Sequence, residues 1–306
     1  MTLVAENLTV RLYPAKGAVH AVNDVSWHLE PGRTLAIVGE SGSGKTVMSL
    51  APLGLLPPGV SADISGSLTL DGTKPTLGSD VGVVFQDPPS ALNPLRRVGS
   101  QVTDAAKLPR KQRRARAIEL LELVGLPDPV RAADAYPHEL SGGMLQRAMI
   151  AGALAGDPRV LIADEPTTAL DASMQEQVLD ALADLQQRLG LALLLITHDI
   201  GVVARMADDV AVMYAGRIVE QGPASRVLQA PEHPYTQGLL AAVPAADVKS
   251  GTRFVGLEGA PPDLTERIRG CAFAPRCPLA LDVCSTDRPE LVDGVSCHVR
   301  THARSR

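Results

Sequence analysis

A glycine-rich segment that directly follows a short apolar run constrains the fold of this 306-residue chain most strongly. Residues 34–38 (TLAIV) are nearly all apolar and bounded by glycines, as expected of a parallel strand buried on both faces. The next eight residues fit the spacing G-x-x-x-x-G-K-[ST]; they are Gly39, Glu40, Ser41, Gly42, Ser43, Gly44, Lys45 and Thr46. Glycines let backbone N–H groups surround an anion, Lys45 reaches nucleotide phosphates and Thr46 offers its hydroxyl to Mg²⁺. The segment therefore predicts a phosphate-binding loop, with an ordinary glycine-rich turn as the alternative.

Short apolar runs alternate with helical patterns along the rest of the chain. Runs like that of residues 34–38 recur at 81–85, 160–163 and 191–196. Between the last two, residues 175–189 carry leucines and a valine at helical spacing, and Gly190 is a plausible end of that helix. Strand, helix and strand in this order predict a parallel α/β sheet.

Other stretches predict additions to this parallel core. Residues 3–12 and 21–29 are β-rich and indicate an antiparallel flank, and Ala215-Gly216 between two further β-rich runs indicates a hairpin. A proline-rich and basic stretch followed by a helical pattern predicts a helical insertion at about residues 88–145. From about residue 231 the composition shifts to proline, glycine and cysteine. We therefore expect one domain over residues 1–230 and a small C-terminal module over residues 231–306.

Composition excludes several classes of protein. Hydrophobic residues make up 45% and charged residues 21% of the chain, which is typical of a globular protein rather than a disordered one. The net charge of −5 and the small number of aromatic residues argue against nucleic acid as a partner. The longest apolar runs fall far short of the roughly 20 residues that cross a bilayer, and the N-terminus lacks a leader pattern, so the chain is expected to stay in the cytoplasm.

Two acidic residues end the apolar run at 160–163. In a protein with a phosphate-binding loop, Asp164 is expected to hold Mg²⁺ and Glu165 to polarise the attacking water. Taken alone, Asp-Glu-Pro after a strand is equally well explained as the cap of a following helix. The loop at residues 39–46 favours the first interpretation.

Residues 140–146 (LSGGMLQ) decide the class, because this is the signature sequence of the ATP-binding-cassette family. The chain resembles that family from residue 3 to about residue 240. The remaining elements follow in the family's order: Gln86 resembles the Q-loop glutamine, Asp171 the D-loop aspartate and His198 the switch histidine. Each is weak alone, since Ser-Gly-Gly is a common turn and a lone histidine at a strand end is more often structural. Together, in this order, they are highly specific.

The resemblance implies a fold and a mechanism. The expected fold is an α/β P-loop ATPase in which two subunits close head to tail on ATP. Ser141, Gly142 and Gly143 are expected to contact ATP held by the opposite subunit. Gln146 and Asp171 are further implied nucleotide-binding residues. Glu165, His198 and Gln86 are the implied catalytic residues, and Thr46, Gln86 and Asp164 the implied Mg²⁺ ligands. Tyr13 is the only tyrosine where the family stacks adenine on an aromatic ring, but a turn residue of no special role explains it equally well.

All four cysteines, Cys271, Cys277, Cys284 and Cys297, lie in the last 36 residues. Without a C-x-x-C knuckle their spacing counts against a zinc ribbon, whereas four thiolates suit a [4Fe–4S] cluster. A zinc staple and a metal-free tail are the alternatives, and His298 is expected to be a bystander. Residues 233–236 and 270–278 resemble the C-terminal extension of peptide and nickel importer ATPases, in which such cysteines carry that cluster.

Within that group the chain resembles the subunit usually called D in oligopeptide and dipeptide systems. The resemblance implies an ATPase on the cytoplasmic face of the inner membrane that drives peptide import. The implied partners are a second ATPase, two permease subunits and an extracytoplasmic binding protein, with no nucleic acid. A nickel or metallophore importer is the alternative, and non-transport and exporter ATPases are disfavoured by the single cassette without a coiled coil or a fused membrane span.

Overall fold

The computed structural model describes residues 2–15, 17–86, 91–168, 170–242 and 257–300, which form two compact units. The first unit comprises the described residues within 1–3, 28–34 and 69–196, and the second those within 4–27, 35–68 and 197–306. Each unit is treated by itself below. The start of the predicted helical insertion, at residue 88, lies outside the described residues. None of the helices in the described ranges combines the length and the apolar character needed to cross a bilayer.

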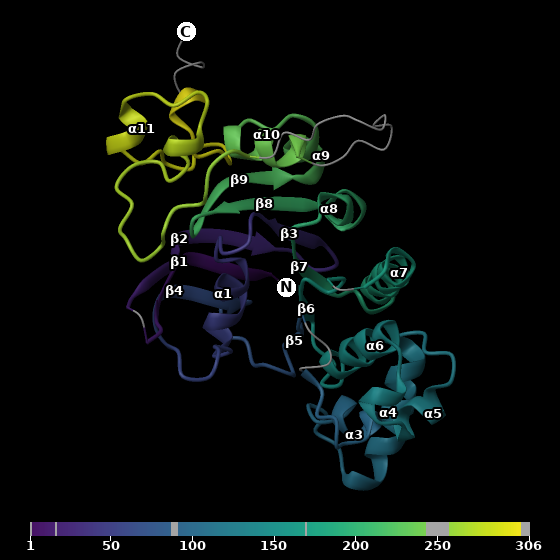
Figure 1. Cartoon of the computed structure of the whole chain (residues 1–306). Coiled ribbons are helices and arrows are strands. Elements are labelled where there is room, and N and C mark those ends of the chain that lie inside the picture. The colour runs from purple at the N-terminus through teal and green to yellow at the C-terminus, as the bar shows by residue number, and fades with distance from the viewer. Residues whose placement is uncertain (1, 16, 87–90, 169, 243–256, 301–306) are drawn as a thin grey trace. The chain divides into compact units, whose positions relative to one another are not determined.

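The first unit is built on three parallel strands, β5 (Val81–Val84), β6 (Val160–Asp164) and β7 (Ala192–Thr197). Its helices are α3 (Val98–Val102), α4 (Arg110–Leu123), α5 (Pro129–Asp134), α6 (Gly142–Ala153) and α7 (Ala172–Leu189), with a 3-10 turn, η2 (Pro137–Glu139). Helices α3, α4, α5 and α6 pack on one another in the blue and teal part of Figure 1. They confirm that the stretch between β5 and β6 is helical.

Burial in this unit follows the sequence pattern. Every residue of β6 and β7 is buried, which explains why both strands read as continuous apolar runs. In α7 the buried side chains are Val178, Leu179, Leu182 and Leu185. Asp171 caps the start of α7 with its carboxylate, and Gly190 ends it in the left-handed conformation, with φ of 65°. The parallel α/β core predicted from the apolar runs is confirmed.

The second unit contains two groups of paired strands. Strand β3 (Thr34–Val38) pairs in parallel with β8 (Asp209–Tyr214), which pairs antiparallel with β9 (Arg217–Pro223). A further sheet has the order β2-β1-β4, with β1 at Leu3–Tyr13, β2 at Val19–Leu29 and β4 at Ser61–Leu70. The helices are α1 (Lys45–Leu50), α8 (Ile200–Met206), α9 (Ala224–Gln229), α10 (Pro234–Ala241) and α11 (Val283–Thr286), with 3-10 turns η1 (Ala51–Leu53) and η3 (Ala274–Arg276).

The predicted hairpin at residues 215–216 is present. Ala215 and Gly216 both have positive φ, 49° and 78°, as the tight turn between β8 and β9 requires. Behind this hairpin, a buried cluster joins Val38 and Val212 to the rings of Tyr214, Tyr235 and Phe273. The hydrophobic core of the second unit therefore includes residues from the end of the chain.

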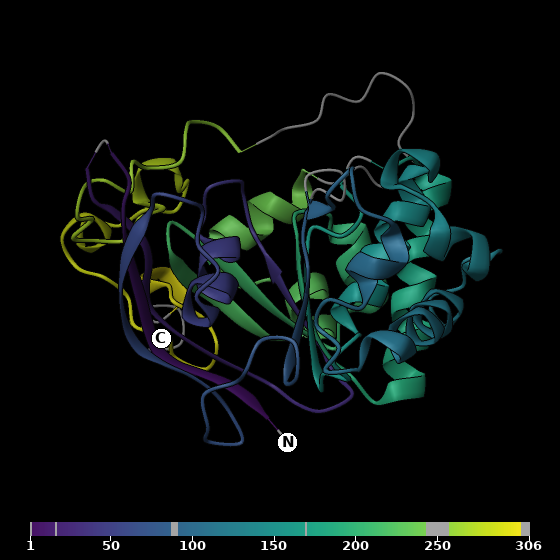
Figure 2. The same ribbon diagram turned by 90° about the horizontal axis from the view of Figure 1, so that it is seen from below.

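The C-terminal segment, residues 257–300, lies along the N-terminal strands of the same unit. Figures 1 and 2 show this yellow segment beside the purple β1 and β2. The backbone N–H of His20 in β2 donates a hydrogen bond to the carbonyl oxygen of Leu264, at 2.8 Å. Contacts over more than 240 positions of sequence thus join the two ends of the chain.

Candidate functional site

The predicted phosphate-binding loop connects β3 to α1 in the second unit. Helix α1 begins at Lys45, and Gly44 precedes it in the left-handed conformation, with φ of 100°. The Lys45 ammonium is buried and donates to the carbonyl oxygens of Gly39, at 2.8 Å, and Glu40, at 3.0 Å. The lysine therefore folds back over the loop, which fixes both the loop and the ammonium group.

Gly39, the first residue of this loop, is required by close packing. Its φ is 153°, and a Cβ atom at this position would lie 2.1 Å from the carbonyl oxygen of Met213 in β8. Because β3 and β8 pair along their length, Met213 cannot retreat without disturbing the sheet. The chain can leave β3 and enter the loop only with glycine here.

The donor set of the loop suits a bound phosphate. The Ser43 hydroxyl is buried without a hydrogen-bond partner among the described residues, which is costly unless a ligand supplies one. A lysine ammonium, a serine hydroxyl and glycine-rich backbone together are groups that bind nucleotide phosphates. The residues of this loop therefore have the chemistry that the predicted phosphate-binding role requires.

Glu165 in the first unit is held by two neighbours. Its Oε2 accepts hydrogen bonds from Gln86 Nε2 and Thr168 Oγ1, both at 2.9 Å. Its backbone has a positive φ of 47°, unusual for a residue other than glycine, and its N–H donates to Ile196 of β7 at 2.8 Å. The structure therefore brings Gln86 and Glu165 together and holds Glu165 in a strained conformation of the kind often found at functional sites.

The signature segment starts α6. Ser141 caps the helix by accepting from the Met144 N–H at 3.4 Å, and Ser141 and Gly142 are exposed. A Cβ on Gly143 would lie 3.2 Å from the sulfur of Met174, a residue in the first turn of α7 after Asp171. The signature segment and the start of α7 are thus neighbours.

Comparison with known proteins identifies the family to which this chain belongs. A family model described as "ABC transporter" matches residues 22–168, and one described as "Oligopeptide/dipeptide transporter, C-terminal region" matches residues 219–284. The "Dipeptide transport ATP-binding protein DppD" of Haemophilus influenzae is 45% identical over 314 residues, which cover 98% of this chain and 94% of the relative. This chain belongs to the ABC transporter family of ATP-binding proteins.

Two further matches describe its place in the ABC family. The "Oligopeptide transport ATP-binding protein OppD" of Mycobacterium tuberculosis is 48% identical over 295 residues, which cover 92% of this chain. The chain spans about half of that relative, at 48% of its length. A solved structure titled as the dimeric, post-hydrolysis state of the ATP-binding cassette MJ0796 bound to ADP and Pi is 28% identical, with a TM-score of 0.61, and covers 72% of this chain and 98% of its own. The P-loop fold of ABC ATPases, with its mixed parallel and antiparallel sheets, is therefore established for this chain.

Most of the other predicted site residues of this ABC protein lie at the ends of strands and helices. Asp164 ends β6 with a buried side chain, and Thr46 lies exposed in the first turn of α1. His198 is exposed directly after β7. Tyr13, at the end of β1, is 36% exposed and its hydroxyl donates to Asp63 at 2.6 Å. Gln146 is buried inside α6, so its predicted contact with nucleotide is not apparent in this subunit.

In the part of the chain that the structure describes, the four cysteines lie in the second unit and are not joined by disulfide bonds. The Cys271 N–H donates to the Cys284 carbonyl oxygen at 2.8 Å, and burial, aided by neighbouring thiols, raises the pKa of the Cys271 and Cys277 side chains. Among the described residues, no three His, Cys, Asp or Glu side chains are arranged to hold a metal ion. This finding does not support the predicted [4Fe–4S] cluster, which stays a prediction.

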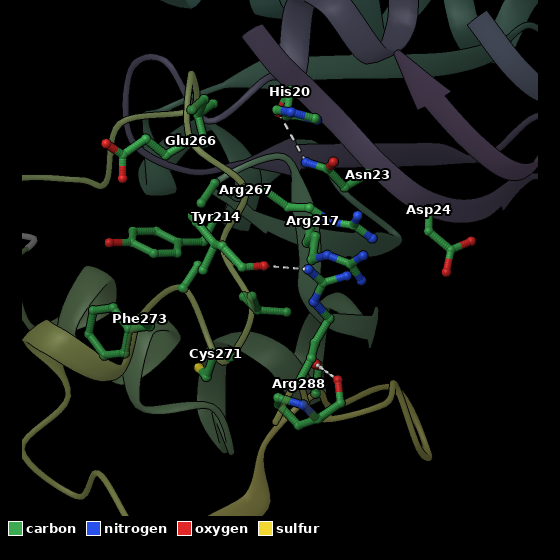
Figure 3. A pocket seen from close by; sticks show the side chains of 18 of the residues that line it. His20, Asn23, Asp24, Tyr214, Arg217, Glu266, Arg267, Cys271, Phe273 and Arg288 are labelled. Atoms are coloured by element: carbon green, nitrogen blue, oxygen red, sulfur yellow. Dashed lines mark hydrogen bonds between the residues drawn. The ribbon is translucent and has the colours of Figure 1, made fainter. Parts of the chain in front are cut away.

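A cavity of about 270 Å³ lies beside this cysteine segment (Figure 3). Arg217 and Arg288 line it together with the rings of Tyr214 and Phe273. Burial and the charge of Arg288 lower the pKa of Arg217 to about 10. Only one of the four cysteines, Cys271, is among the lining residues, so this cavity is not a four-cysteine site.

Sequence reasoning missed two residues that touch the phosphate-binding loop. Arg276 forms an ion pair with Glu40, and the hydroxyl of Tyr235 accepts a hydrogen bond from the Glu40 N–H. The available signal was the position of Arg276 directly before Cys277 in a Pro-Arg-Cys sequence. That signal was interpreted only as part of a cysteine pattern.

Proposed function

We propose that this chain is the ATP-hydrolysing subunit of a bacterial importer for oligopeptides or dipeptides. The observation that carries the proposal is the combination of a phosphate-binding loop with a carboxylate, Glu165, held at a strand end by Gln86. Relatives named for oligopeptide and dipeptide transport match nearly the whole chain. Both point to ATP hydrolysis coupled to peptide uptake.

In this proposal the loop binds the phosphates of ATP and Glu165 polarises water. Lys45 and the glycine-rich backbone neutralise charge on the β- and γ-phosphates, and the Ser43 hydroxyl gains a partner there. The carboxylate of Glu165 accepts the proton of the attacking water, with the hydrogen bonds from Gln86 and Thr168 fixing its direction. His198 contacts the γ-phosphate, and Tyr13 stacks on adenine.

Mg²⁺ supplies charge neutralisation between the β- and γ-phosphates when it is bound. The oxygen donors assigned to it are those of Thr46, Asp164 and Gln86, which suit a hard cation. The side-chain nitrogen of Gln86, Nε2, donates to Glu165. The side-chain oxygen of Gln86, Oε1, is therefore the atom of this amide that can bind a cation. The chemistry of these residues therefore fits the assigned metal.

A second ATPase subunit would complete the site. The exposed Ser141 and Gly142 at the start of α6 offer backbone N–H groups to an anion, and the solved cassette of similar fold is dimeric. Gly143 and Asp171 belong to the same surface in this proposal, whereas Gln146 is buried within α6. The partner is expected to be a related ATPase, and two permease subunits and an extracytoplasmic binding protein are expected to complete the complex at the cytoplasmic face of the inner membrane.

Reconstitution tests the transported substrate. ATP hydrolysis would be measured in the complex of this chain with its permeases, partner ATPase and loaded binding protein. Short peptides are expected to stimulate hydrolysis several-fold, and nickel chelates are not. Stimulation only by nickel chelates would leave the ATPase assignments intact and move the substrate to a metal complex.

We also propose that the C-terminal module, residues 231–306, carries the iron–sulfur cluster predicted from its four cysteines. Support comes from the clustering of four cysteines that form no disulfide among the described residues, and from the match of a peptide-transporter C-terminal model to residues 219–284. Among the described residues no group of side chains forms a site for a single metal ion, and no step of ATP hydrolysis is derived from the cluster.

Metal content tests this cluster. Anaerobically purified protein is expected to contain four irons and four sulfides per chain, as [4Fe–4S] requires, with a broad visible absorption. Cys277→Ser should lose most of the iron and the absorption, because one ligand is removed. Purified wild-type protein that contains only zinc, or no metal at all, would contradict the cluster.

A further inference from the structure

Glu40, the second residue of the phosphate-binding loop, is held from two sides by residues near the end of the chain. Arg276 donates to both carboxylate oxygens of Glu40, from Nη1 at 2.7 Å and from Nη2 at 2.9 Å. The Glu40 backbone N–H donates to the hydroxyl of Tyr235 at 2.9 Å. Side chain and main chain of one loop residue are therefore both fixed by the C-terminal part of the same unit.

The Arg276 interaction is buried and bidentate, unlike an ordinary surface ion pair. The Arg276 side chain is only 5% exposed and that of Glu40 26%. Arg276 also donates from Nε to the carbonyl oxygen of Glu258, at 2.9 Å, and from Nη2 to that of Leu257, at 3.3 Å. A charged pair with this geometry is strongly directional, and removing one partner leaves the other charge poorly solvated.

Arg276 packs against a cluster of three aromatic rings, one of which is Tyr235. Ring centroids lie 4.5 Å apart for Tyr214 and Tyr235 and 5.4 Å apart for Phe273 with each of them. The Arg276 guanidinium lies 5.8 Å from the ring centre of Tyr214 and 5.9 Å from that of Phe273. Figure 3 shows Tyr214 and Phe273 together on one side of the cavity. The chain has only three Phe, four Tyr and one Trp, and three of these eight aromatic residues lie in this cluster.

Tyr235 is further fixed by the start of its own helix. The Nδ1 atom of His233 accepts the Tyr235 N–H at 3.0 Å, which caps α10. Burial lowers the pKa of His233 to about 4, so the ring is neutral at pH 7 and keeps a nitrogen that accepts. The His233 N–H in turn donates to the buried carboxylate of Glu220 in β9, at 3.0 Å. The Tyr235 hydroxyl is thus held at the end of a chain of packed, hydrogen-bonded groups.

We propose that Arg276 and Tyr235 are positioning residues for nucleotide binding, an inference that rests on the proposed ATPase function. They act through Glu40, whose carbonyl oxygen also accepts from the Lys45 ammonium, at 3.0 Å. With Glu40 fixed, the main chain of the loop and Lys45 are oriented for phosphates before ATP arrives, and ordering them costs less on binding. By thermodynamic reciprocity, bound ATP stabilises the segment of residues 257–277. The C-terminal segment is therefore part of the nucleotide site.

Equilibrium binding of ATP to the full chain tests the proposal, with turnover measured alongside. Arg276→Ala is expected to weaken ATP binding about tenfold and to raise the KM for ATP similarly, while kcat at saturating ATP changes by less than about twofold. Tyr235→Phe keeps the ring in its cluster and removes only the hydroxyl, so it folds even where Arg276→Ala does not, and it should weaken binding about threefold. Arg269→Ala, which removes an exposed arginine of the same segment, serves as the matched control and should bind ATP like the wild type.

Two further measurements test whether Arg276 acts on ATP binding through Glu40. The effects of Arg276→Ala and Glu40→Ala should not add in the double variant, because both remove one interaction. In hydrogen–deuterium exchange, ATP should protect residues 257–277 of the wild type and not those of Arg276→Ala. If the wild-type protein binds no ATP, the proposed ATPase function itself is contradicted. If the wild type binds ATP and both Arg276→Ala and Tyr235→Phe bind it equally well, the positioning role is wrong.

Discussion

Glu165→Gln is expected to leave ATP binding intact and to reduce turnover at least about 100-fold. The glutamine keeps the size of the side chain, and its amide oxygen can still accept from Gln86 and Thr168, so the local structure should survive. What it loses is the negative charge that accepts a proton from water. Since hydrolysis then stops after nucleotide has bound, the variant should accumulate as an ATP-bound dimer, visible as a larger species in size-exclusion chromatography.

A nearby glutamate provides the control for this experiment. Glu176 is exposed on α7, and Glu176→Gln removes the same charge without touching Glu165. Its turnover should match that of the wild type. Sustained hydrolysis by purified Glu165→Gln would refute the role assigned to Glu165, and equal losses in both variants would show a general effect of charge.

The elements predicted well from sequence are those whose residues interact locally or repeat with a regular period. Strand β3 and the loop after it were predicted because an all-buried parallel strand leaves a continuous apolar run and a phosphate-binding loop needs glycines at fixed spacing. Helix α7 begins three residues before the predicted range, at Ala172, because its first turn carries none of the periodic leucines and valines and its start is set by the Asp171 cap. The turn at Ala215-Gly216 was predicted for the same local reason.

Contacts between distant residues were not predictable in this way. Arg276 and Glu40 are separated by 236 positions, and neither periodicity nor a motif links them. The positive φ of Glu165 is likewise a consequence of packing against β7, since nothing in its sequence favours a left-handed residue there. The cysteine pattern shows the opposite problem, because four clustered cysteines predict a metal site that the described side chains do not form. The spacing of residues in the sequence therefore indicates which residue types a site contains, but it does not determine how their side chains are arranged in space.

The largest effect on stability is expected from Gly39→Ala. A Cβ atom there would lie 2.1 Å from the Met213 carbonyl oxygen and 3.1 Å from the Ser43 hydroxyl oxygen, and the φ of 153° is unfavourable for alanine. Because Met213 belongs to β8, which is paired with both β3 and β9, the clash falls on backbone that cannot relax cheaply. We expect a loss of about 3 kcal/mol in the free energy of unfolding, measured by urea titration.

Gly42→Ala separates steric clash from backbone strain in the same loop. Gly42 also has a positive φ, 78°, but a Cβ there would meet no atom within 4 Å. Its cost should therefore be the left-handed conformation alone, about 1 kcal/mol. A Gly39→Ala variant as stable as Gly42→Ala would mean that the loop can leave β3 by another path, and the close packing of Gly39 against β8 would then not be what fixes the start of the phosphate-binding loop.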